Sequence, residues 1–148
     1  MIPTASERRP RNLELARVLL VDDEVASRLT LQTLLEAAGY CVDVAASAAE
    51  ALGKLDEQEY ELVLSAPEME SPAAGHHVLA YARVKQYRPA TALVTAYRDA
   101  VDGKRSPQDE QQVSIKTENV SSLLGKVAEL IGLRATRRSE RALRQLVG

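Results

Sequence analysis

The sequence predicts an α/β fold in which buried strands alternate with amphipathic helices along one chain. Short apolar runs such as residues 18–21 and 62–64 are typical of strands that are buried on both faces. Helical periodicity follows most of these runs. The alternation indicates right-handed crossovers and a parallel sheet with helices on both faces. The length of 148 residues, 45% of them hydrophobic, is enough for one such domain.

Apolar runs and helix-end signals place the individual elements. Strands are expected at residues 17–21, 40–46, 62–66, 91–95 and 113–116. Helices are expected at residues 25–38, 47–58, 76–88 and 119–131. Gly39 is predicted to end the first helix, because glycine accepts the left-handed backbone of a helix C-terminus. Ser47 and Glu50 form a capping box that opens the second helix, and Pro67 ends the third strand.

The segment between the fourth and fifth strands breaks this rhythm. Between residues 97 and 113 the only apolar side chains are Ala100 and Val101, so a helix there has almost no face to bury. We expect one weak helical turn followed by a loop. Residues 98–112 should be the least ordered internal segment, because burial does not offset the conformational entropy there.

Charge separates an acidic body from basic ends. Four Arg and two Glu give residues 1–17 a net charge of +2, and five Arg and one Glu give residues 133–148 a charge of +4. Because the whole chain carries −2, residues 18–132 carry −8. We predict a flexible basic leader over residues 1–16, one folded domain over residues 17–132, and a basic C-terminal tail with a short helix, which Gly132 separates from the domain.

Composition excludes several classes of protein. No apolar run approaches the roughly 20 residues of a membrane span, and the N-terminus lacks the apolar region of a secretory signal. A single cysteine, Cys41, rules out a disulfide framework and favours a cytoplasmic setting, with the thiol as a small core side chain. The basic tail shows no helix-turn-helix, zinc-ligand spacing or aromatic interleaving, so DNA reading is not favoured over a solvated or dimer-assisting helix.

Five side chains stand at or just after the carboxyl ends of four predicted strands. Asp22 and Asp23 follow the first strand, and Ala66, Thr95 and Lys116 are the last residues of the third, fourth and fifth strands. In an open parallel sheet the carboxyl ends of the strands are where ligands bind and chemistry occurs. The sequence therefore predicts a site at this edge.

These residues, in this order and spacing, resemble the receiver domain of two-component response regulators over residues 17–131. The resemblance implies a flavodoxin-like, doubly wound sheet of five parallel strands in the order 2-1-3-4-5, with a short or disordered fourth helix. In that family an aspartate after the third strand accepts a phosphoryl group from a phosphohistidine, and Mg²⁺ offsets the repulsion between carboxylates and phosphoryl oxygens.

Most of the family's site residues carry over. Asp22 and Asp23 match the acid pair that holds the metal, Thr95 matches the hydroxyl, and Lys116 matches the lysine that pairs with phosphate oxygens. Ala66 stands at the acceptor position, and a methyl group can neither be phosphorylated nor ligate a metal. The resemblance therefore implies a vestigial phosphorylation pocket.

Other positions depart from the family's pattern together with the acceptor. Val113 occupies the aromatic switch position, Glu70 replaces a proline, and Gly75 comes one residue late.

With Glu68 or Glu70 as a third carboxylate, Asp22 and Asp23 are candidate ligands of a weak Mg²⁺ site. An internal salt-bridge cluster with Lys116 is the favoured alternative, and no cofactor is expected. Ser65 is an alternative acceptor, but strand alternation points it to the other side of the sheet.

The preferred hypothesis is a degenerate receiver that is not an enzyme and acts by contact with a signalling protein, either a histidine kinase or a downstream effector. A homodimer is compatible with this hypothesis, and a membrane is not a partner. A second hypothesis is a receiver that uses Mg²⁺ and a substitute acceptor. A third is a nucleic-acid adaptor that acts through the Arg-rich tail.

Overall fold

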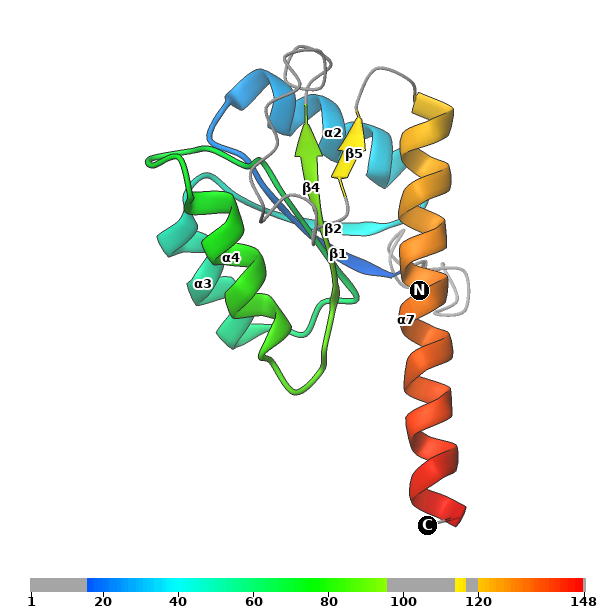
Figure 1. The fold of residues 1–148 in the computed structure, drawn as a ribbon. Helices are drawn as coiled ribbons and strands as arrows, with labels where there is room; N and C mark the ends of the chain where they lie inside the picture. The colour runs from blue at the N-terminus through cyan, green and yellow to red at the C-terminus, as the bar shows by residue number, and fades with distance from the viewer. Residues whose placement is uncertain (1–15, 96–113, 117–119, 148) are drawn as a thin grey trace, which may run out of the picture.

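The computed structural model describes residues 16–95, 114–116 and 120–147. Residues 1–15 of the predicted basic leader, the segment 98–112 with its predicted weak helical turn, and the switch position Val113 lie outside the described residues. The described parts form a sheet flanked by helices, with one long helix that extends past the sheet (Figure 1).

The sheet has five parallel strands in the order β2-β1-β3-β4-β5, which is the predicted order. The strands are β1 (Arg17–Val21), β2 (Cys41–Ala45), β3 (Leu62–Ser65), β4 (Ala90–Thr95) and β5 (Ser114–Lys116). The helices are α2 (Val25–Ala37), α3 (Ala48–Glu57), α4 (Ala74–Arg83) and α7 (Val120–Val147). The α/β class is therefore confirmed.

Helices cover both faces of this sheet, as the sequence predicts. Leu35 of α2 and Val127 of α7 belong to one buried cluster, on the side of the sheet where Leu20 points. The second cluster joins α3 and α4 to the opposite side of the strands. Each face is a continuous apolar core, because successive residues of a strand point to opposite sides.

The predicted signals at the end of α2 and at the start of α3 are confirmed. Gly39 has a φ of 105° just after α2, a conformation that side chains with a Cβ rarely adopt. The Ser47 hydroxyl accepts a hydrogen bond from the Glu50 amide at 3.1 Å. The Glu50 carboxylate accepts from the Ala46 amide at 3.3 Å, one residue before the expected partner. The turn before α3 is thus held from both sides.

The predicted bounds of α4, residues 76–88, are wrong at both ends. The helix begins at Ala74 because the chain turns tightly after β3, where the Gly75 amide donates to the Pro67 carbonyl at 3.0 Å. It ends at Arg83 because the next side chain, Val84, is 77% exposed and gains nothing from a further turn. A short turn then leads to β4, and Arg88 in that turn has a φ of 44°.

The prediction that Cys41 is a small core side chain is wrong, and part of the apolar surface of α2 is exposed. Val25 and Leu29 of α2 are 57% and 54% exposed, because α2 packs against the sheet through the face that carries Leu31 and Leu35. Cys41 is exposed rather than part of the core. It lies at the start of β2, an outer strand that is paired on one side.

Helix α7 continues through Gly132, so the predicted break at this residue is wrong. A glycine costs a helix interior only about 1 kcal/mol relative to alanine, and the following Arg, Ala, Glu and Leu residues are good helix formers. The core contacts of α7 nevertheless end near Leu130, which is 7% exposed. Leu143 and Leu146 are 60% and 84% exposed. Residues 133–147, the α7 arm, therefore project beyond the sheet (Figure 1).

Candidate functional site

The strand register brings the ends of β1, β3 and β4 to one edge of the sheet. Val21 of β1 is the partner of Ser65 on β3, and Ser65 is the partner of Leu93 on β4. The next residues of β1 and β3, Asp22 and Ala66, are therefore neighbours at the carboxyl edge. The Ala66 amide donates to the Val21 carbonyl at 2.9 Å, which fixes this arrangement.

Asp22 is half-buried, and backbone contacts hold it. Its amide donates to the Ala45 carbonyl at 3.0 Å, and its carboxylate accepts from the Glu24 amide at 3.0 Å. Burial raises the pKa of this carboxyl group above its usual value; the Glu24 amide opposes that rise, and the charges of Asp23 and Glu24 add to it. The surroundings of Asp22 therefore stabilise its ionised carboxylate less well than water does.

Arg28 is the contact at this site that the sequence did not indicate. Its Nη1 donates to the Asp22 carbonyl at 2.8 Å, and its charge favours the ionised Asp22 side chain. Asp22 and Arg28 are six residues apart and belong to different elements, so no helix-face or strand-alternation rule pairs them.

The backbone of Ala66 is held between β1 and α4. A Cβ atom on Gly75 would lie 2.0 Å from the Ala66 carbonyl oxygen and 2.7 Å from the Pro67 Cα. Only glycine allows this approach, because a Cβ is essentially never found below 3.0 Å from such atoms. Gly75, which comes one residue late relative to the family pattern, therefore packs directly against the acceptor position.

Ser65 is fully buried, and its hydroxyl donates to the Ala66 carbonyl at 2.9 Å. The hydroxyl group is therefore engaged inside the protein, in agreement with the strand alternation that turns it away from the pocket.

Thr95 and Lys116 are placed together by the backbone. They are register partners on β4 and β5, at the same edge as Asp22 and Ala66. Thr95 is partly buried. The side chain of Lys116 lies outside the described residues, so the predicted salt-bridge cluster with Asp22 and Asp23 remains a prediction.

The carboxylates of the next loop do not join Asp22 and Asp23. Glu70 accepts hydrogen bonds from the Ala48 amide at 3.0 and 3.3 Å, so it caps the start of α3. Glu68 is exposed. Within residues 16–95, 114–116 and 120–147, no three His, Cys, Asp or Glu side chains lie close enough to hold a metal ion. This donor set does not fit the carboxylate-rich Mg²⁺ site that the resemblance implies.

Comparisons with known proteins agree with this geometry. The model of the response regulator receiver domain matches residues 18–121. No curated protein matches the chain. Among the described residues, no helix combines the length and apolar character needed to span a membrane.

Several solved structures share the fold. A CheY-like receiver domain protein from Methanospirillum hungatei is 24% identical, with a TM-score of 0.70, over 84% of this chain and 99% of that one. CheY4 of Vibrio cholerae is 23% identical, with a TM-score of 0.63, over 78% and 98% of the two chains. The response regulator TrrA of Thermotoga maritima, solved with Mg²⁺ and BeF, is 27% identical, with a TM-score of 0.62, over 78% and 99%.

Proposed function

Because the chain belongs to the response regulator receiver family, we propose that it is a degenerate receiver, which is not phosphorylated at the usual position and which acts by protein–protein contact. Its partner is a signalling protein of a two-component pathway, either a histidine kinase or a downstream effector. The protein is cytoplasmic and is not an enzyme in this proposal.

The observation that carries the proposal is the methyl group of Ala66 beside Asp22. The Ala66 amide is bonded to Val21, and the backbone packs against Gly75, so the strand end keeps a defined geometry. Phosphoryl transfer to a receiver requires a nucleophilic oxygen at that position. A methyl group has no lone pair to attack phosphorus, and the neighbouring hydroxyl of Ser65 is buried and hydrogen-bonded.

Metal binding is expected to be weak for the same structural reason. Two carboxylates, one of them half-buried with a raised pKa, offer fewer oxygen ligands than the hard Mg²⁺ ion usually finds in such a site. In this proposal, binding of a partner, the expression level of the protein or an unconventional signal sets its state in place of phosphorylation.

The test is phosphorylation by a small donor. The protein is incubated with Mg²⁺ and acetyl phosphate, and its intact mass is measured. We expect no mass increase of one phosphoryl group. The matched control is the Ala66→Asp variant, which supplies a carboxylate at the strand end. This variant should gain the adduct if the rest of the pocket is intact.

A stoichiometric adduct on the unmodified protein would refute the proposal. Amide NMR provides the second readout: addition of Mg²⁺ and beryllofluoride should leave the signals of Asp22 and Thr95 in place. Large shifts at these positions would show that the site still binds a phosphoryl-like group.

A further inference from the structure

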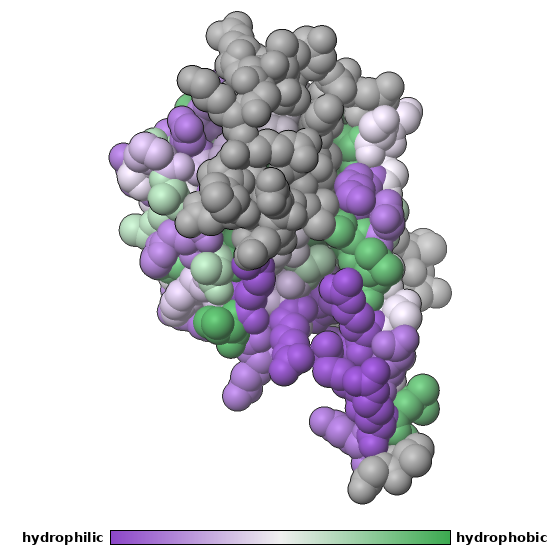
Figure 2. Space-filling view, in the orientation of Figure 1, coloured by the Kyte–Doolittle hydropathy of each residue, from purple (hydrophilic) through white to green (hydrophobic). Residues whose placement is uncertain are grey.

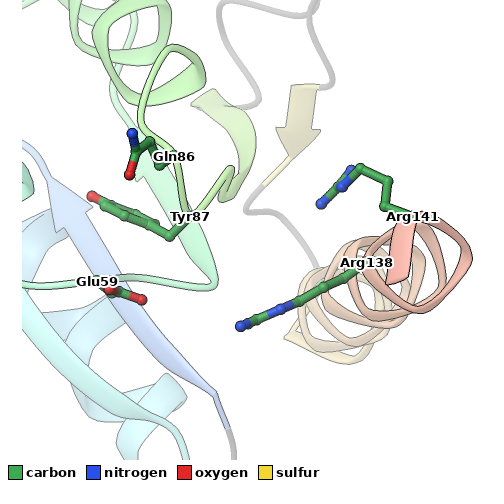
Figure 3. Close-up of a pocket in the computed structure, with 5 residues that line it drawn as sticks. All are labelled: Glu59, Gln86, Tyr87, Arg138 and Arg141. Atoms are coloured by element: carbon green, nitrogen blue, oxygen red, sulfur yellow. The ribbon is translucent and has the colours of Figure 1, made fainter. Parts of the chain in front are cut away.

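A second charged site lies at the opposite edge of the sheet. A cavity of about 240 Å³ separates the α7 arm from the segments that precede β3 and β4. We call it the arginine cleft; its lining residues are Glu59, Gln86, Tyr87, Arg138 and Arg141 (Figure 3). Because Glu59 and Tyr87 come just before their strands begin, the cleft is at the amino edge, remote from Ala66.

One arginine ties the α7 arm to the body of the domain. The Arg134 guanidinium donates to the Tyr87 carbonyl at 2.7 Å and to the Arg88 carbonyl at 3.1 Å. Tyr87 is fixed at its other end as well, because its hydroxyl donates to the Leu55 carbonyl at 2.9 Å. Hydrogen bonds within the protein therefore connect the two walls of the cleft.

Helical spacing brings three arginines to the cleft side of the arm. Arg134, Arg138 and Arg141 follow one another at intervals of four and three residues, so they share one face of the helix. The same face buries Val127 and Leu130 where α7 still covers the sheet. In Figure 3, Arg138 and Arg141 extend from the helix across the cavity, and Glu59 points toward Arg138.

Within the part of the chain that the structure describes, Arg138 and Arg141 form no ion pair. The pKa of Arg134 is lowered, first by burial and then by the charges of Arg138 and Arg141, while Glu59 and Glu61 oppose the change. The ion pairs of the described residues are Arg17–Asp43, Lys85–Asp56 and Lys126–Glu129, and neither cleft arginine is among them. Strongly hydrophilic side chains gather where the arm faces the body (Figure 2).

We propose that the arginine cleft binds an extended acidic peptide segment of a partner protein, with carboxylates of the peptide on Arg138 and Arg141. A guanidinium offers a planar pair of N–H donors that matches a carboxylate. The opposite wall carries the Glu59 carboxylate and the Gln86 amide, which accept hydrogen bonds from the backbone amides of the peptide.

Glu59 favours a peptide over a nucleic acid. A phosphodiester group has no N–H or O–H donor for the Glu59 carboxylate, so it would only place negative charge beside it. The cavity also has room for a side chain or two rather than for a duplex. A peptide with acidic side chains supplies both the anion and the N–H donors.

The test uses a fluorescent peptide of alternating Asp and Gly residues, titrated with the protein at an ionic strength of about 0.15 M. Anisotropy should show saturable binding, which the matched Asn/Gly peptide lacks. Arg138→Gln and Arg141→Gln should each raise the Kd about fivefold or more. Arg137→Gln and Arg144→Gln remove the same charge from exposed residues outside the cleft, and they should change the Kd less than about twofold.

Four results would overturn the inference. Equal weakening by all four substitutions would mean diffuse attraction to the basic arm. Tighter binding of a labelled single-stranded oligonucleotide, or displacement of the peptide by phosphate at constant ionic strength, would assign the arm to phosphate-bearing ligands. Absence of saturable peptide binding would also reject it. None of these results depends on whether phosphoryl donors modify the protein, so this inference and the proposed function are tested separately.

Discussion

At the scale of single residues, Asp22 shows what remains at the strand ends beside Ala66. The carboxylate is half-buried, and among the described residues only one hydrogen bond, from the Glu24 amide, reaches it. Burial therefore dominates and raises its pKa. Ionisable side chains whose burial lowers the stability of the folded protein are common at functional sites, because the surrounding structure holds them in place.

Asp22→Asn should stabilise the protein at neutral pH. In the folded state the raised pKa makes the carboxyl group hold its proton more tightly than in the unfolded chain, so stability falls as pH rises from near 3.8 through the raised pKa. Asparagine keeps an oxygen for the Glu24 amide but has no charge to desolvate. Urea unfolding should show a gain at about pH 7 that shrinks toward about pH 4.

Glu68→Gln is the control for this measurement, because Glu68 is exposed and its substitution should leave the pH dependence unchanged. A variant Asp22→Asn that is less stable at neutral pH would mean that the Glu24 hydrogen bond to the charged oxygen outweighs the cost of burial.

At the scale of elements, the close contact between α4 and the end of β3 positions the acceptor site. Gly75 allows the first turn of α4 to touch the backbone of Ala66 and Pro67. Glu70, in the same loop, caps α3 and so links the loop to a second helix. The loop after β3 is thus held by contacts with two helices.

Gly75→Ala should destabilise the protein by about 2 kcal/mol, because the new methyl group must displace backbone atoms. Gly53→Ala, inside α3, should instead stabilise it by up to about 1 kcal/mol, since a Cβ there meets nothing within 4 Å and alanine is the better helix former. Chemical denaturation of both variants measures the difference. Similar effects of the two substitutions would contradict the close approach seen at Gly75.

Elements whose signals are local could be predicted from the sequence, and contacts between distant segments could not. The five strands and the meeting of Asp22, Ala66 and Thr95 follow from apolar runs and from parallel pairing. The bond from Glu70 to α3 and the continuation of α7 through Gly132 depend on how separate segments pack. A glycine ends a helix only where no contact favours a further turn. Here the hydrogen bonds from Arg134 to the turn before β4 favour the continuation of α7 past Gly132.

At the scale of the whole molecule, the acidic body and the basic arm are nearly separate units. The buried clusters contain no residue of α7 beyond Ile131. Stability therefore resides in residues 16–131, and the arm contributes a charged surface.

Removal of residues 133–148 should leave a folded domain. The deletion takes away five Arg and one Glu, so the net charge changes from −2 to −6. We expect a single cooperative unfolding transition, with a loss of less than about 2 kcal/mol from the hydrogen bonds of Arg134. Circular dichroism during urea unfolding tests this, and a truncated chain without a cooperative transition would contradict it.

Helix α7 also acts geometrically as a lever. Its 28 residues give it a length of about 42 Å, and the part beyond Leu130 measures about 25 Å. A rotation of about 5° at Leu130, where the helix leaves the sheet, moves the free end by about 2 Å. Because Arg134 is hydrogen-bonded to Tyr87 and Arg88, such a rotation either moves the turn before β4 together with α7 or breaks these bonds, and in the second case the width of the arginine cleft changes.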